Sequence, residues 1–303
     1  MIKDYITIAR PLQWVKNLAF VPGIVLAAFS SKIPAASFLM KALYGGVSLC
    51  LISSANYVIN DFCDASSDIH NRLKKHKPEV LRRLSVRQIY FFYMALATAG
   101  LLMAMSVSMK FFWVSIFYCM MGIVYNVRPF RSKDIPFLDV LSESVNNPIR
   151  LLCGWYIVTE QTTPAVSLLL GYWMGGAFLM GSKRLAEYRM IADRKSLSLY
   201  RKSFSVYTHK NLFVSVLCYG IGALALFAVF FIQYKIELLL CMPLLGYWSL
   251  RLFLTGLEKG SRMVSPELVF INRENVILSI SFALCVYAFL GVRLPWLRSL
   301  FGG

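Results

Sequence analysis

The chain has 303 residues, of which 58% are hydrophobic, 15% aromatic and 16% charged, and its mean hydropathy is +0.60. A soluble domain carries about 45–50% apolar and about 25% charged residues, so this composition excludes an ordinary soluble protein. The formal net charge of +17 would suit a nucleic-acid partner. Its placement in short connections between apolar stretches, however, argues against a nucleic-acid surface and for a membrane protein.

Apolar stretches of about 20 residues recur along the chain, which is the length that a membrane helix requires. We therefore expect an all-α, polytopic fold of about nine transmembrane helices, forming a single integral membrane domain over residues 1–303. The expected spans are roughly 15–31, 38–60, 87–107, 110–127, 137–158, 164–184, 211–232, 236–256 and 274–292.

Most of the 32 Lys and Arg residues fall on one side of these spans. Positive charge marks the cytoplasmic side, so we expect a cytoplasmic N-terminus in a bacterial cytoplasmic membrane. The two longest connections, 61–86 and 185–210, both lie on this side and are rich in Lys and Arg. Placed over one mouth, they would enclose a polar chamber that attracts anionic substrates.

The most informative stretch closes the second apolar segment and reads Asn-Asp-Phe-Cys-Asp-Ala-Ser-Ser-Asp from residue 60 to residue 68. On a helix, Asp61, Asp64 and Asp68 fall within about a 60° arc, with Asn60 beside them. Hard oxygen ligands on one face suit Mg²⁺, which binds a few carboxylates together with the phosphates of a substrate. The pattern predicts a Mg²⁺ site; the simpler alternative is a solvated acidic helix end.

The second long connection begins with Lys183 and Glu187, which share a helical face, and with Arg184 beside them. Farther along the same connection lie Arg201, Lys202 and Tyr207. Glu187 would add a metal ligand, and the cations would bind phosphate oxygens. The alternative is a basic loop that only sets the topology.

Polar residues also run along two expected spans at spacings of three and four. The fifth span carries Asp139, Glu143, Asn146, Asn147 and Arg150, and the eighth carries Tyr247, Arg251, Thr255 and Glu258. Ionisable groups at membrane depth are costly and usually face a cavity or a partner. These stripes predict either a polar cavity or buried ion pairs that hold the helices together.

Clustered carboxylates, a basic rim and a membrane cavity suit a reaction that joins a diphosphate compound to a lipid. Mg²⁺ would stabilise the departing diphosphate, and the cations would hold the remaining phosphates. The residue pattern contains no Ser-His-Asp or Cys-His arrangement that would indicate a covalent enzyme intermediate.

The NDxxDxxxD pattern from Asn60 to Asp68 resembles the first acidic motif of the UbiA superfamily of membrane prenyltransferases, and the resemblance covers essentially the whole chain. Further stretches are similar to one branch, the decaprenyl-phosphate phosphoribosyltransferases. They are RPLQWVKN at Arg10 to Asn17, KRLAE at Lys183 to Glu187, RKSFSVYT at Arg201 to Thr208, Pro266-Glu267 before the last helix, and Asp139 and Arg150 on the fifth span.

This resemblance implies helices around a central cavity that opens to the cytoplasm, and Mg²⁺-dependent transfer of 5-phosphoribose from phosphoribosyl pyrophosphate to a polyprenyl phosphate. Diphosphate would leave, and the product would be a lipid-linked precursor for cell-envelope polysaccharide. The expected metal ligands are Asp61, Asp64, Asp68 and Glu187, and the first three, with Asp139 and Arg150, are the expected catalytic residues. The expected substrate-binding residues are Lys16, Asn17, Asn60, Lys74, Lys77, Lys183, Arg184, Glu187, Arg201, Lys202, Tyr207 and Arg251.

The stretch 71–84 departs from the branch pattern, although Lys74, Lys77 and Pro78 keep it loosely. The departure leaves a phosphorylated sugar other than ribose as an alternative donor. A first alternative function is that of a UbiA-type prenyltransferase that moves a prenyl group from prenyl diphosphate to an aromatic or other small acceptor. Against it, the second connection lacks a carboxylate cluster as dense as the first. A second alternative is a transporter, which would not require three helix-phased Asp residues at one mouth.

Overall fold

The computed structural model describes residues 2–68, 83–191, 197, 200–258 and 260–300. Within these ranges all regular secondary structure is helical, which confirms the predicted all-α class. Seven of the described helical segments are long and apolar enough to cross a membrane, so a polytopic membrane protein is also confirmed. The described chain forms two compact units, residues 1–164 with 193–207, and residues 165–192 with 208–303.

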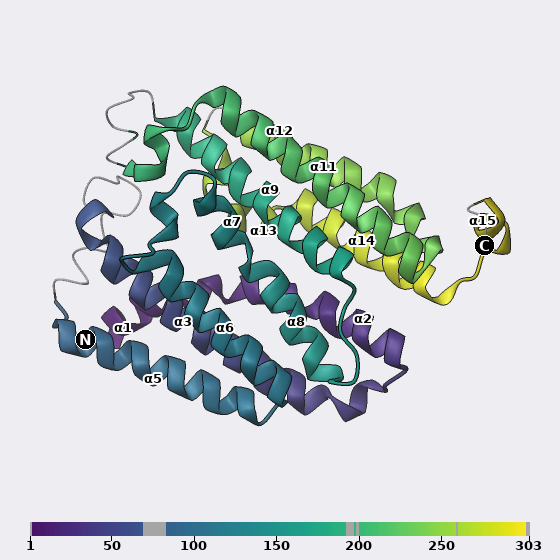
Figure 1. The fold of residues 1–303 in the computed structure, drawn as a ribbon, viewed down its shortest axis with the longest axis horizontal. Helices are drawn as coiled ribbons and strands as arrows, with labels where there is room; N and C mark the ends of the chain where they lie inside the picture. Colours follow the sequence, from purple (N-terminus) through teal and green to yellow (C-terminus); the bar gives the residue numbers. More distant parts are fainter. Residues whose placement is uncertain (1, 69–82, 192–196, 198–199, 259, 301–303) are drawn as a thin grey trace. The chain divides into compact units, whose positions relative to one another are not determined.

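The first unit begins with a short helix and a 3₁₀ segment and continues with longer helices (Figure 1). Its elements are α1 (Ile2–Ala9), η1 (Pro11–Phe20), α2 (Val21–Ser31), η2 (Ala35–Ser37), α3 (Leu39–Asp68), α5 (Val86–Met105), α6 (Met109–Asn126), η3 (Ser132–Asp134), α7 (Leu138–Ser144), α8 (Asn146–Val158) and η4 (Lys202–Ser205).

Two of the nine expected spans, 137–158 and 164–184, are not among the seven that meet the length and hydropathy requirement. The first is divided at Val145 into α7 and α8, each too short to span a bilayer alone. Pro148 accounts for the break, because it has no N–H to donate to the carbonyl of Ser144. The exact number of crossings therefore stays a prediction.

Close backbone approach joins α2 to α8 within the first unit. A Cβ added at Gly154 would lie 1.9 Å from the carbonyl oxygen of Phe20, and one at Gly23 would lie 2.2 Å from that of Leu151. Only glycine fits at these two positions. Small residues allow membrane helices to pack closely, and this contact fixes α8 beside the start of the chain.

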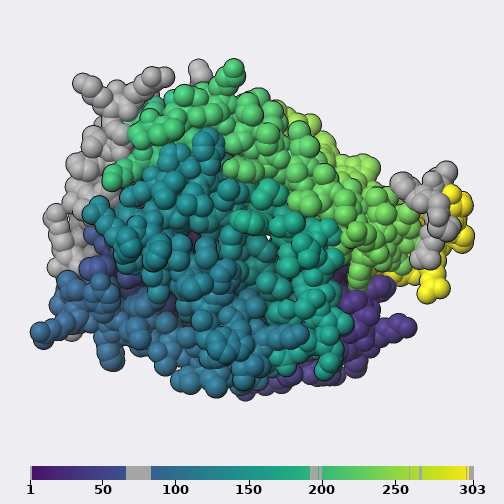
Figure 2. Space-filling model, in the orientation of Figure 1, coloured from purple at the N-terminus to yellow at the C-terminus, as the bar shows by residue number. Residues whose placement is uncertain are grey.

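Large apolar side chains cover the outward faces of the first unit. On α5, Phe91 is 77% exposed and Leu102 63%, and on α6 Trp113 is 60% exposed. The space-filling view shows the α5 and α6 region as one closed surface (Figure 2). Apolar exposure on this scale is typical of helices that face lipid.

The described part of the second unit contains four longer helices, two helices of six residues and two 3₁₀ segments. Its elements are α9 (Val166–Met190), α11 (His209–Tyr234), η5 (Ile236–Cys241), α12 (Met242–Leu257), η6 (Arg262–Val264), α13 (Pro266–Ile271), α14 (Arg273–Gly291) and α15 (Pro295–Leu300). Helices α9 and α11 pack along each other, and η5 packs against α11 and α14. The prediction of a single domain over 1–303 stays untested.

Candidate active site

Asp61, the first carboxylate of the acidic motif, is buried against an arginine from the N-terminal segment. It is 1% exposed, and its two oxygens accept hydrogen bonds from Arg10, with 3.0 Å between Nε and Oδ2 and a second contact between Nη2 and Oδ1. Arg10 also lies over the ring of Tyr57, 5.1 Å from its centroid. A bidentate pair of this kind fixes the start of η1 onto α3.

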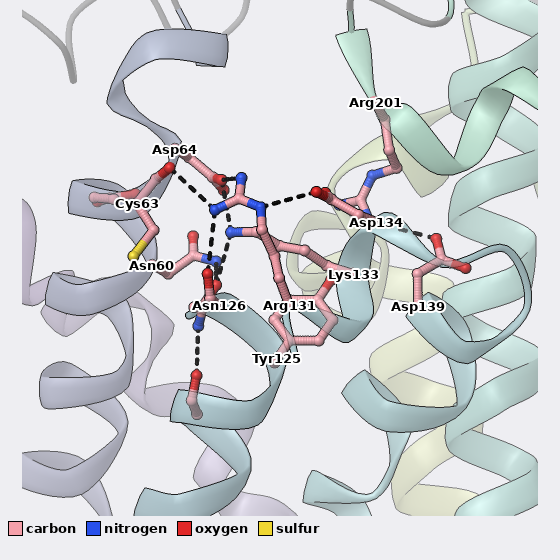
Figure 3. A network of polar contacts seen from close by, with 12 residues as sticks. Asn60, Cys63, Asp64, Tyr125, Asn126, Arg131, Lys133, Asp134, Asp139 and Arg201 are labelled. Carbon is pink, nitrogen blue, oxygen red and sulfur yellow. Dashed lines mark hydrogen bonds and ion pairs between the residues drawn. The ribbon is translucent and has the colours of Figure 1, made fainter. Parts of the chain in front are cut away.

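Asp64, one turn farther along α3, is bound by two cations from the connection between α6 and α7 (Figure 3). Its Oδ1 lies 3.0 Å from Nη2 of Arg131 and 2.6 Å from Nζ of Lys133. Arg131 also donates to Asp134 and to the carbonyl oxygens of Cys63 and Asn126, at 3.0 to 3.2 Å. Arg131 thus joins the acidic end of α3 to the end of α6.

Asn60 is oriented by the same cluster. Its Nδ2 donates to Oδ1 of Asn126 at 2.6 Å, and Lys133 donates to the same oxygen at 2.8 Å. Lys133 is only 4% exposed. Burial is the main cause that lowers the pKa of Lys133, with smaller contributions in the same direction from Arg131 and Arg201, while Asp64 raises it. The cluster therefore concentrates positive charge around one carboxylate.

Asp139, at the start of α7, is fully buried and receives three donors from residues 201–207. The hydroxyl of Tyr207 donates to Oδ1 at 2.6 Å, that of Ser203 to Oδ2 at 3.1 Å, and Nη1 of Arg201 lies 3.4 Å from Oδ2. The predicted RKSFSVYT motif is thus attached to α7 by one carboxylate. In this structure Asp139 binds protein groups, and its expected catalytic role stays a prediction.

Arg150, on α8, is 6% exposed. Its Nε donates to Oδ1 of Asn17 at 2.9 Å and its Nη2 to the hydroxyl of Tyr118 at 2.7 Å. Asn17 in turn donates to Ser53 at 2.9 Å. These contacts join η1, α3, α6 and α8, so both predicted site residues in this group, Asn17 and Arg150, have a clear role in helix packing.

The second unit holds the remaining described candidates. Arg184 and Glu187 form a buried pair on α9, with 2.9 Å between Nη1 and Oε2. Arg251 on α12 forms an ion pair with Glu274 on α14. The structure thus identifies a partner for the predicted metal ligand Glu187. Its role as a metal ligand stays a prediction, as do the phosphate-binding roles of Lys183 and Arg184.

Some predicted residues cannot be placed. Lys74 and Lys77 lie outside the described residues, as does the side chain of Asp68 at the end of α3. The structure also places three residues on the acidic motif that were not among the predicted site residues: Arg10, Arg131 and Lys133. The available signal was their position, just after α6 for Arg131 and Lys133 and at the start of the RPLQWVKN stretch for Arg10.

The donor set fits a hard divalent cation at Asp64 better than at Asp61. Arg131 and Lys133 hold Oδ1 of Asp64, so Mg²⁺ would bind there only after these two cations move to another anion. Carboxylate and amide oxygens, such as those of Asp64 and Asn60, are the ligands that Mg²⁺ prefers. Both oxygens of Asp61 contact Arg10. Among the described residues, no group of three or more His, Cys, Asp and Glu could hold a metal.

Comparison with known proteins identifies the family. The model of the UbiA prenyltransferase family matches residues 18–263. The chain belongs to this family. Its fold is similar to that of a UbiA homologue from Archaeoglobus fulgidus bound to GPP and Mg²⁺, with a TM-score of 0.72 and 21% identity over 95% of this chain and 100% of that one. The same homologue bound to DMAPP and Mg²⁺ gives a TM-score of 0.72 at 20% identity, over 96% of this chain and 100% of that one.

Two curated bacterial proteins are similar in sequence. Nodulation protein NoeC of Azorhizobium caulinodans is 26% identical over 232 residues, which cover 76% of this chain and 71% of that protein. Protein y4nM of Sinorhizobium fredii, which is uncharacterized, is 28% identical over 154 residues, covering 50% of this chain and 28% of that protein. The family is one of membrane prenyltransferases, which supports an enzymatic role for this chain.

Proposed function

We propose that this UbiA-family protein transfers 5-phosphoribose from phosphoribosyl pyrophosphate to a polyprenyl phosphate and releases diphosphate. A phosphate oxygen of the lipid would attack C1 of the ribose, and the bond from C1 to the diphosphate oxygen would break. The lipid phosphate is already an anionic nucleophile, so it needs little help from a general base. The product would serve as a sugar donor for cell-envelope polysaccharide.

The observation that carries the proposal is the density of cations on the acidic motif of the first unit. Arg131 and Lys133 bind Asp64, and Arg201 reaches Asp139 on the neighbouring α7. A donor with both a diphosphate and a separate phosphate needs more than one cationic subsite. A prenyl diphosphate carries no second phosphate, so Arg201 would have less to bind in a prenyltransferase.

Asp64 and Asp68 are the residues that would hold Mg²⁺, with Asn60 beside them. Mg²⁺ at this position would neutralise the diphosphate as it leaves. Lys133 and Arg131 would move from Asp64 towards phosphate oxygens when the donor binds. Asp61 would keep Arg10 in place. Asp61 is therefore not among the metal ligands of this proposal, although the sequence predicted it as one.

The remaining predicted residues have supporting roles in this scheme. Lys16 and Lys202 would attract the donor, and Lys74 and Lys77 would bind its phosphates. The phosphate-binding role of Lys183, which lies in the second unit, stays a prediction. The cytoplasmic membrane, with the N-terminus and the active site on the cytoplasmic side, is part of the same proposal, because it follows from the distribution of Lys and Arg.

A second candidate is prenyl transfer from a prenyl diphosphate to a small acceptor. It is favoured by the fold similarity to a UbiA homologue that binds GPP or DMAPP with Mg²⁺. The same acidic motif would serve either donor, so the donor must be identified by experiment.

The test uses purified protein in detergent with Mg²⁺, polyprenyl phosphate and radiolabelled phosphoribosyl pyrophosphate. We expect label in the lipid phase, and a loss of about 100-fold or more in Asp64→Asn. Asp134→Asn is the matched control, because Asp134 also binds Arg131 but is more exposed, at 27% against 14%. Transfer from labelled prenyl diphosphate to an aromatic acceptor, with none from phosphoribosyl pyrophosphate, would replace the proposal by the second candidate.

A further inference from the structure

The segment from Tyr200 to Tyr207 is held onto the first unit by a row of aromatic contacts as well as by Asp139. Phe137 packs edge-on against Tyr207 at 5.1 Å, Tyr207 lies 6.0 Å from Phe204, and Phe204 stacks on Tyr200 at 6.0 Å. Phe204 and Tyr207 are 3% and 4% exposed. This part of the second long connection is therefore buried against the first unit.

The hydroxyl of Tyr207 links two groups of the first unit. It accepts a hydrogen bond from the backbone N–H of Phe137 at 2.6 Å and donates one to Oδ1 of Asp139, also at 2.6 Å. Phe137 has a φ of 64°, which is strained for a residue with a bulky side chain. Strain of this kind persists where the surrounding contacts enforce it, and such positions cluster at functional sites.

The three donors on Asp139 differ in exposure. Ser203 is fully buried and Tyr207 nearly so, but the side chain of Arg201 is 20% exposed and makes the longest of the three contacts, at 3.4 Å. The buried hydroxyls thus fix the carboxylate, while the arginine lies at its outer edge. Figure 3 shows Arg201 and Asp139 beside the cluster that contains Lys133 and Arg131.

We infer that Asp139 is a positioning residue: it holds the Arg201 guanidinium beside the cationic cluster, where Arg201 binds the phosphate of the donor that is not part of the leaving group. Ser203 and Tyr207 fix the carboxylate, and Asp139 itself touches no reacting atom. The identity of the donor in this inference rests on the proposed function. The attachment of residues 201–207 by Asp139 does not.

The test is a double-mutant cycle read without turnover. Binding of labelled phosphoribosyl pyrophosphate with Mg²⁺, in the absence of lipid acceptor, is measured for Asp139→Asn, Arg201→Gln and the double variant. We expect each single change to raise Kd about tenfold, as loss of one charge-assisted contact does, and the double variant to be no worse than Arg201→Gln. Arg201→Lys should restore most of the binding, because it keeps the charge.

Hydrogen exchange supplies a second measurement that does not depend on the donor. Asp139→Asn should accelerate exchange at the amide of Phe137 and at residues 203–207, and Arg201→Gln should not. Ser203→Ala is a milder change at the same carboxylate. Ser205→Ala is its matched control, since Ser205 is exposed and its hydroxyl donates to the carbonyl of Lys202 in its own turn.

The outcomes are distinguishable. Unchanged exchange in Asp139→Asn, or fully additive effects on Kd, would overturn the inference, because Asp139 would then not act through Arg201. If the native protein binds no phosphoribosyl pyrophosphate but Asp139→Asn accelerates exchange at residues 203–207, the proposed donor is wrong and the anchoring role of Asp139 remains. The Ser205→Ala control should leave Kd unchanged. A rise in Kd as large as that of Asp139→Asn would also contradict the inference.

Discussion

The buried pair between Arg10 and Asp61 gives a quantitative prediction for stability. Arg10→Gln removes the guanidinium that contacts both oxygens of Asp61, a carboxylate that is 1% exposed. Removing one partner of a buried ion pair costs about 3–5 kcal/mol. For a unit of this size, each kcal/mol lowers the unfolding midpoint by about 2–4 °C, so we expect Arg10→Gln to lower it by at least about 6 °C.

Asp61→Asn should lower the free energy of unfolding by less than Arg10→Gln does. The remaining Arg10 side chain is 19% exposed, and the amide oxygen of the new asparagine still accepts one hydrogen bond from it. The double variant should be more stable than Arg10→Gln alone, because it buries no carboxylate charge at residue 61. Arg83→Gln is the control: its pair with Asp4 is 3.8 Å long and Arg83 is 69% exposed, so the expected loss is below about 1 kcal/mol.

The assay is thermal unfolding in detergent. A thiol-reactive dye that labels buried cysteines as they become exposed reports the unfolding midpoint. A shift for Arg10→Gln as small as that for Arg83→Gln would refute a buried ion pair. A larger loss for Asp61→Asn than for Arg10→Gln would contradict the predicted asymmetry. Either result would reopen the assignment of Asp61 as a metal ligand.

Two further predictions test the packing of each unit. Gly154→Ala should destabilise the protein by about 1–3 kcal/mol, because the new Cβ would lie 1.9 Å from the carbonyl oxygen of Phe20. Gly246→Ala is the control and should be neutral or slightly stabilising, because its new Cβ would have nothing within 4 Å. Equal unfolding midpoints for the two variants would contradict the α2–α8 contact. The sulfurs of Cys241 and Cys285 lie 3.2 Å apart, so mild copper-catalysed oxidation should join them. A mass unchanged by oxidation would show that η5 does not pack on α14 at these residues.

Sequence patterns predicted much of this protein because membrane helices have a strong signal in length and hydropathy. The apolar stretch predicted a span over 38–60, and the helical phasing of the Asn60 to Asp68 pattern matches the continuation of α3 to Asp68. The division of the expected span 137–158 was not foreseen, although Pro148 is visible in the sequence. A proline within an apolar run marks a break only when the surrounding packing does not repair it.

The partners of the acidic motif could not be predicted for a different reason. Arg131 and Lys133 lie 67 and 69 residues after Asp64, and a single sequence contains no signal that pairs them. They were visible only as part of the basic side of the membrane. The role of Asp139 as an anchor was hidden in the same way, since its donors come from a connection about 60–70 residues later.

The most direct test of the central claim is donor transfer with label in two positions. Phosphoribosyl pyrophosphate carrying label on its 5-phosphate should transfer that label to polyprenyl phosphate in the lipid phase. The same donor labelled in its β-phosphate should leave all label in the aqueous phase as diphosphate. If neither label enters the lipid phase in the presence of Mg²⁺, while a labelled prenyl diphosphate is consumed, the phosphoribosyl account is contradicted.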